Sequence, residues 1–80
     1  MEMKLKVTFE NNPSIQVEVD RGETLADVAR KAREQKLPIP EEWYTFVHGY
    51  LPGVVNHKAT SNLVQLGIFD GDEINFHPLL

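Results

Sequence analysis

The stretch that decides the fold closes the sequence: Leu66-Gly-Ile-Phe-Asp-Gly-Asp-Glu-Ile-Asn-Phe-His-Pro-Leu-Leu80. Its Asp-Gly-Asp segment at 70–72 has turn chemistry, because glycine tolerates positive φ and aspartate can bond to the backbone two residues on. In residues 74–77 apolar Ile and Phe alternate with Asn and His, the period-two pattern of a half-buried strand. A strand at the end of the sequence can pair only with strands from earlier residues, so its neighbours in the sheet must precede it in the sequence.

Two short amphipathic strands open the chain. Residues 3–9 alternate Met, Leu, Val and Phe with Lys and Thr, and residues 15–20 alternate Ile and Val with Gln, Glu and Asp. The Asn-Asn-Pro-Ser cluster at 11–14 predicts a turn between them, and therefore an antiparallel hairpin with one apolar face. A lone hairpin is only marginally stable in water, so this face needs a cover.

A helix is predicted to supply that cover. Thr24 is the expected N-cap, with acidic Asp27 three residues on as in a capping box. Four apolar residues between 25 and 32 follow the i, i+3, i+4, i+7 spacing of one helical stripe. The helix is expected to end near Lys36, because Pro38 disfavours the α conformation at the residue before it.

The second half of the chain is predicted to complete a sheet. Residues 43–48, Trp-Tyr-Thr-Phe-Val-His, are rich in aromatic and β-branched side chains and predict a third strand. Residues 54–56 can form a short fourth strand, and one helical turn within 60–66 can bury two leucines. The resulting order predicts an α+β, β-grasp fold over a single domain, residues 1–80. It has a mixed sheet of four or five strands, one helix packed across it, and the first and last strands parallel at its centre.

The composition excludes several classes of protein. A net charge of −4 without a clustered basic face argues against nucleic acid binding, since the basic residues at 30–36 fit the solvated face of a helix. Without cysteine there is no disulfide scaffold, thiolate zinc site or cysteine nucleophile. No apolar run is long enough to span a bilayer, and no signal-peptide core is present. We therefore expect a soluble, cytoplasmic monomer that binds neither nucleic acid nor membrane.

No set of residues predicts catalysis, a metal or a cofactor. His48, His57 and His77 lie on different predicted elements, and no carboxylate cluster completes a set of four ligands. The Asp-Gly-Asp turn at 70–72 lacks the twelve-residue loop of an EF-hand. No nucleophile elbow or phosphate-binding glycine loop is present. We expect a protein without enzymatic activity and without a cofactor.

Four segments together carry a family resemblance across nearly the whole chain. They are the opening strand 3–9, Gly-Glu-Thr-Leu-Ala-Asp at 22–27, Val-Asn at 55–56, and Asp-Gly-Asp-Glu-Ile-Asn-Phe-His-Pro at 70–78. In these the chain resembles ubiquitin-like β-grasp proteins, and most of all the prokaryotic sulfur carriers: the molybdopterin-synthase small subunit and the thiamine-biosynthesis carrier. The resemblance implies a protein partner, such as a larger enzyme subunit or an activating enzyme.

The ending departs from that family. Sulfur carriers and conjugated modifiers end in a flexible Gly-Gly tail, whose small residues let the backbone approach an enzyme closely. Here the sequence closes on Leu79-Leu80, and its last glycine is Gly71. We therefore expect a non-catalytic ubiquitin-like interaction module related to sulfur carriers. The alternative is a sulfur carrier for molybdopterin or thiamine biosynthesis whose Gly-Gly tail is missing from this chain.

Both faces of strand 43–48 carry aromatic side chains, and one helix covers only one of them. Aligning Gly49 with the hairpin glycine of ubiquitin implies that Trp43, Thr45 and Val47 point inward and that Tyr44, Phe46 and His48 point outward. This alignment buries a threonine in mid-strand, so the opposite orientation stays open. The uncovered face is either an interaction surface or is covered by the loop 49–57.

The resemblance places partner binding on this sheet face, where ubiquitin-like proteins commonly bind. The C-terminal leucines either pack at the end of the sheet or dock into the partner. The predicted partner-binding residues are Tyr44, Phe46, His48, Asn75, His77, Leu79 and Leu80.

Overall fold

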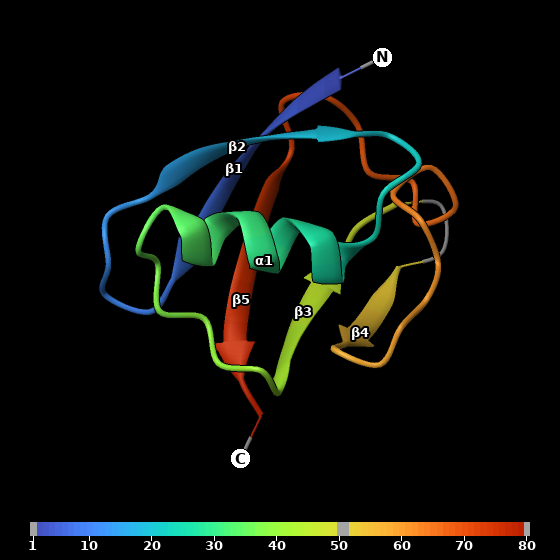
Figure 1. Ribbon diagram of the computed structural model, residues 1–80. Helices are drawn as coiled ribbons and strands as arrows, with labels where there is room; N and C mark the ends of the chain where they lie inside the picture. The colour runs from blue at the N-terminus through green and yellow to red at the C-terminus, as the bar shows by residue number, and fades with distance from the viewer. Residues whose placement is uncertain (1, 50–51, 80) are drawn as a thin grey trace.

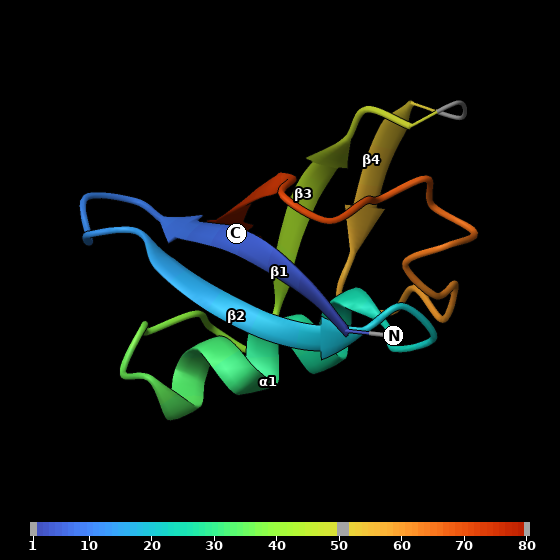
Figure 2. The same ribbon diagram turned by 90° about the horizontal axis from the view of Figure 1, so that it is seen from above.

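A five-stranded mixed sheet carries one helix across one of its faces (Figures 1 and 2). The computed structural model describes residues 2–49 and 52–79. The strand order is β2-β1-β5-β3-β4, as in the predicted β-grasp fold. The elements are β1 (Glu2–Phe9), β2 (Ile15–Asp20), α1 (Leu25–Glu34), β3 (Trp43–Val47), β4 (Gly53–Asn56) and β5 (Glu73–Pro78).

The first and last strands form the centre of the sheet. β1 pairs antiparallel with β2 and parallel with β5, with Lys6 opposite Glu73 and Phe9 opposite Phe76. Backbone bonds from Lys6 N–H to the Asp72 carbonyl (3.0 Å) and from Gly71 N–H to the Lys4 carbonyl (2.8 Å) fasten the closing turn to β1. The prediction that the C-terminal strand lies beside the first one is therefore confirmed.

The N-terminus of α1 is closed by a complete capping box. The Asp27 N–H donates to Oγ1 of Thr24 (3.3 Å), and the Thr24 N–H donates to the Asp27 carboxylate (3.0 Å). This second bond, helped by nearby Arg30, lowers the pKa of Asp27 because it stabilises the ionised form.

The helix ends at Glu34, slightly before the predicted point near Lys36. Lys36 adopts a left-handed conformation (φ 74°), and its N–H donates to the Arg33 carbonyl. The N–H of Leu37 donates to the Ala32 carbonyl, which completes a Schellman motif. Backbone geometry thus ends the helix before Pro38 does.

The core lies between α1 and the sheet. Trp43 and Phe76 meet edge to face with ring centroids 4.8 Å apart, a favourable aromatic geometry. The helix contributes its predicted apolar stripe, Leu25, Val28, Ala29 and Ala32, all buried.

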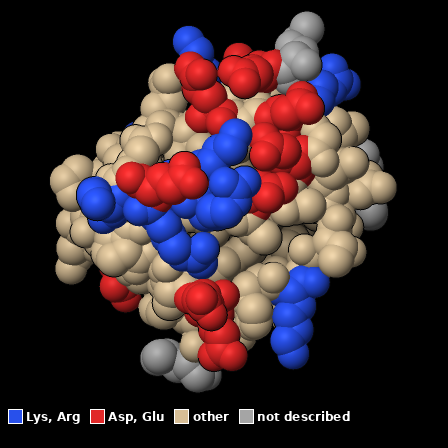
Figure 3. Space-filling model, viewed as in Figure 1, with Lys and Arg blue, Asp and Glu red and all other residues tan. Residues whose placement is uncertain are grey.

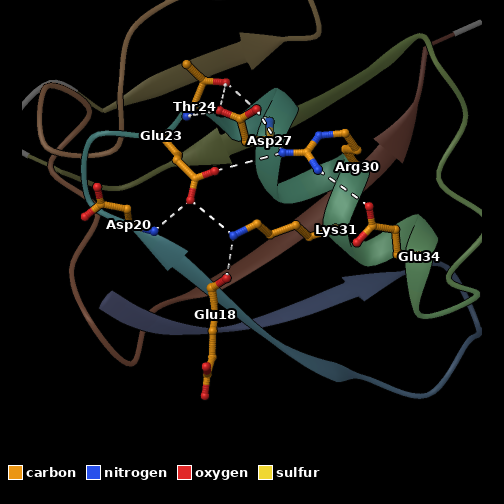
Figure 4. Close-up of polar contacts among 8 residues, drawn as sticks. All are labelled: Glu18, Asp20, Glu23, Thr24, Asp27, Arg30, Lys31 and Glu34. Carbon is orange, nitrogen blue, oxygen red and sulfur yellow. Dashed lines mark hydrogen bonds and ion pairs between the residues drawn. The ribbon is translucent and has the colours of Figure 1, made fainter. Parts of the chain in front are cut away.

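Charged residues on the helix side form a paired network (Figures 3 and 4). Lys31 Nζ contacts the Glu23 carboxylate (3.2 Å) and the Glu18 carbonyl (2.9 Å), and Arg30 contacts Glu34 (3.5 Å). Gln35 donates to the Gln16 carbonyl (2.8 Å). These side chains cover the outer edge of β2, which limits its pairing with another strand.

The second half follows the prediction closely. β4 is short and begins at Gly53, one residue before the predicted strand. In the segment after β4, Asn62 and Gln65 exchange hydrogen bonds like a capping box (2.8 and 2.9 Å), and Leu66 N–H donates to the Asn62 carbonyl. This single turn buries Leu63 fully and Leu66 partly.

Candidate functional site

The orientation of β3 decides which side chains face solvent. Trp43, Thr45 and Val47 are 2%, 0% and 4% exposed and point toward the helix. Phe46 points the other way and is 49% exposed, with Tyr44 half-buried on the same face. The orientation that the sequence left open is therefore the one implied by the likeness to ubiquitin.

Three rings gather on the face of the sheet that α1 leaves uncovered. Tyr44 stacks on His77 with centroids 5.1 Å apart, and Phe46 meets both rings near edge-on, at 5.7 Å from Tyr44 and 6.0 Å from His77. Tyr44 and His77 are also register partners in the ladder between β3 and β5. We call Tyr44, Phe46 and His77 the aromatic patch.

The other predicted residues lie around the patch. Asn75 is exposed on β5, and its side-chain oxygen accepts a hydrogen bond from the Thr8 hydroxyl. His48 is exposed directly after the end of β3. Leu79 is 41% exposed while its N–H donates to the Glu42 carbonyl (3.0 Å), so its backbone pairs at the sheet end and its side chain faces solvent. Leu80 lies outside the described residues.

The described part of the loop 49–57 does not cover the patch. Residues 53–56 pair with β3 as an edge strand, in the plane of the sheet. Val54 is the register partner of Phe46 and is 62% exposed. Opposite residues of an antiparallel pair share a face, so Val54 extends the apolar surface beside Phe46.

A cleft opens beside the patch because β3 and β5 part. Their register runs only through the pairs Trp43–Pro78 and Tyr44–His77 among the described residues, and Figure 1 shows the strands diverging beyond them. Gly49, which follows β3, lines the cleft opposite β5. It packs so closely on the segment 66–67 that a Cβ on Gly49 would lie 2.4 Å from the Leu66 carbonyl oxygen. The cleft is open to solvent and has a volume of about 610 Å³.

The described residues offer no metal site and no spanning helix. No group of three histidine, aspartate or glutamate side chains among them is placed to hold a metal ion. Within the same residues, no helix has the length and apolar character that crossing a membrane requires.

Two exposed apolar residues of this region were not predicted. Val54 could have been found by placing it opposite Phe46 in a hairpin register. Phe69 is 66% exposed and lines the cleft. It directly precedes the Asp-Gly-Asp turn predicted at 70–72, and no sequence signal marks it.

Comparison with known proteins defines the fold class. No protein-family model and no curated protein matches the sequence. Among solved structures, ubiquitin of Caldiarchaeum subterraneum superposes with a TM-score of 0.71 at 24% identity, covering 100% of this chain and 96% of that one. The ubiquitin-like domain of Plasmodium falciparum Dsk2 gives 0.70 at 17% identity, with 96% and 97% coverage. The C-terminal ubiquitin-like domain of mouse tubulin-specific chaperone e gives 0.66 at 16%, with 99% and 88%.

The chain therefore has the ubiquitin-like fold, in the α+β class, with a five-stranded mixed sheet and one helix. These three neighbours are ubiquitin or ubiquitin-like domains by name. The narrower resemblance to sulfur carriers remains a prediction.

Proposed function

We propose that the chain is a non-catalytic interaction module that binds a protein partner through the aromatic patch and β5. The observation that carries this proposal is the exposure of Phe46, 49%, on a sheet face that α1 leaves open. A large aromatic side chain normally contributes most when buried, so an exposed one beside other apolar groups favours an interface.

The geometry suits a binding anchor because the ring is held in place before binding. Phe46 contacts Tyr44 and His77, which are themselves half-buried in the central part of the sheet. Such support limits the rotamers that the side chain can lose on binding, and this lowers the entropic cost of association. Aromatic anchors of this kind often carry most of the binding energy of an interface.

Polar groups around the patch would orient the partner. Asn75 and His48 present hydrogen-bonding side chains beside the apolar rings, and Leu79 extends the apolar surface along β5. A hydrophobic centre with a polar rim is the usual anatomy of a protein interface. We place the module in the cytoplasm, as a monomer acting with a larger enzyme subunit or an activating enzyme.

The experiment is a comparative affinity capture with quantitative mass spectrometry. Wild-type protein should enrich a partner that Phe46→Ala loses. The matched control is Val64→Ala, a truncation of another exposed apolar residue (43% exposed) on the turn that contains Leu63. It should retain the partner. Equal capture by both variants would contradict binding through the patch.

The sulfur-carrier alternative rests on the ending at 70–78, which forms the turn and central strand expected of those carriers. It requires a C-terminal Gly-Gly that residues 72–80 do not contain. Incubation with a cognate activating enzyme and ATP labelled in its adenylate tests it directly. Transfer of labelled adenylate to this chain would favour the carrier over the interaction module.

A further inference from the structure

One buried hydroxyl bonds across β3 and β5 beside the point where their register ends. In the register of these strands, Phe46 and Asn75 would form the next hydrogen-bonded pair beyond Tyr44 and His77. Instead the Asn75 carbonyl accepts the hydroxyl of Thr45 at 2.7 Å. The register of the two strands ends at Tyr44 and His77, and β3 and β5 diverge (Figure 1). Residues 46–49 and 72–75 line the cleft from the two sides.

Two exposed aromatic residues line the cleft from different elements. Phe46 belongs to β3, and Phe69 lies in the turn before β5. Phe69 is 66% exposed, and two hydrogen bonds fix its backbone: its N–H donates to the Asp72 carboxylate (2.8 Å), and its carbonyl accepts the Asp72 N–H (3.0 Å). Aromatic faces attract cations, and arginine most often.

The charges of the cleft favour the same kind of ligand. Asp72 and Glu73 line it, together with His48, and no lysine or arginine is among its described lining residues. Asp72 already accepts the Phe69 N–H, whereas Glu73 is exposed and forms no ion pair among the described residues. Lys6 on β1 is the register partner of Glu73. A guanidinium group matches a carboxylate through charge-assisted hydrogen bonds.

We propose that this cleft receives a basic side chain, preferentially arginine, from the protein that docks on the aromatic patch. The inference rests on the proposed function, because the cleft and the patch share Phe46. In this arrangement the guanidinium lies between the Phe46 and Phe69 rings and bonds to the Glu73 carboxylate. The partner therefore carries an exposed arginine next to the apolar surface that covers the patch.

The test uses a defined probe and needs no partner. The full chain, labelled with ¹⁵N, is titrated with the peptide acetyl-Gly-Arg-Gly-amide while amide chemical shifts are followed. The matched peptide has citrulline in place of arginine, which keeps the shape and removes the charge. The arginine peptide should cause saturable shifts at the amides of His48, Glu73 and Asn75, and the citrulline peptide should not.

Two variants test whether the Glu73 carboxylate binds the arginine peptide. Glu73→Gln should weaken binding of the arginine peptide about threefold, a value within the range for an exposed ion pair. Glu18→Gln removes an equal charge from the same sheet face, on β2 and away from the cleft, and should leave binding unchanged.

Equal shifts with both peptides, or equal losses from both variants, would overturn the proposal. Phe46-dependent capture of a protein partner is measured separately. If that capture persists while the arginine probe fails, the proposed function stands and only the basic ligand is wrong.

Discussion

The hydroxyl of Thr45 donates a hydrogen bond of 2.7 Å to the carbonyl oxygen of Asn75, at the point where β3 and β5 separate. This bond explains how a threonine with 0% exposure is accommodated under the helix. The side chain satisfies its own buried hydroxyl and, at the same time, a strand carbonyl that the ladder leaves unpaired.

Thr45→Val should destabilise the protein because it removes the donor and keeps the shape. The Asn75 carbonyl would lose this partner at a part-buried site beside the cleft, and a lost hydrogen bond of this kind costs about 0.5–1.5 kcal/mol. Urea denaturation measures the free energy of unfolding. Thr8→Val removes a hydroxyl whose bond to the Asn75 side chain is exposed to water, so it serves as the control and should cost less. A neutral Thr45→Val would mean that the buried bond contributes nothing.

Phe46→Ala should change stability little. The side chain is 49% exposed, so the free energy of unfolding is expected to fall by about 1 kcal/mol or less, mainly through lost strand propensity and ring contacts. Val47→Ala, next to it but 4% exposed, should cost about 2 kcal/mol through lost burial and a cavity. Thermal and urea unfolding would distinguish them, and a larger loss at Phe46 would place that ring in the core.

Gly49→Ala should destabilise the protein and disturb the cleft. A Cβ there would lie 2.4 Å from the Leu66 carbonyl oxygen and 2.9 Å from the Cα of Gly67, so backbone must move. Overpacking of this kind typically costs about 1–3 kcal/mol. Gly53→Ala is the matched control, since nothing lies within 4 Å of its added Cβ. Equal melting temperatures for the two variants would contradict the close approach of the two loops.

The capping box makes stability depend on acid pH. Hydrogen bonding from Thr24 N–H lowers the pKa of Asp27 in the folded state, so the unfolded state binds more protons between the folded and unfolded pKa values. The contribution of the ionised Asp27 carboxylate to the free energy of unfolding is therefore complete above about pH 5, and it is lost as the pH falls through the folded-state pKa.

Asp27→Asn should accordingly flatten the decline of melting temperature between about pH 5 and pH 2. Glu34→Gln, on the same helix, controls for the loss of one negative charge. An undiminished decline in Asp27→Asn would show that this carboxylate is not a source of the acid sensitivity. Thr24→Ala, which removes the other half of the box, should cost about 0.5–2 kcal/mol at neutral pH.

Most of the fold could be predicted because its signals are local. Alternation in β1 and β2, the capping box at Thr24, and the Asp-Gly-Asp turn at 70–72 each report the backbone conformation of a few residues. The predicted end of the helix, near Lys36, lies slightly beyond its observed end at Glu34. The reason is that Lys36 adopts the left-handed conformation that glycine usually supplies at a helix C-terminus.

The candidate site was harder to predict because it depends on contacts between distant residues. A buried Thr45 makes the observed orientation of β3 uncertain from the sequence alone, because the Asn75 carbonyl that accepts its hydroxyl belongs to another strand. The two are thirty residues apart in sequence, so no local pattern reveals the bond. Phe69 was missed for the same reason, since its exposure depends on how the turn lies against β1.

Binding of a captured partner to wild-type protein and to Phe46→Ala tests the central claim most directly. Calorimetric titration should give a dissociation constant about thirtyfold higher for Phe46→Ala, the loss expected when an interface hot spot of about 2 kcal/mol is truncated. Its melting temperature should stay close to that of the wild type. An unchanged dissociation constant in a folded Phe46→Ala variant would contradict binding through the aromatic patch.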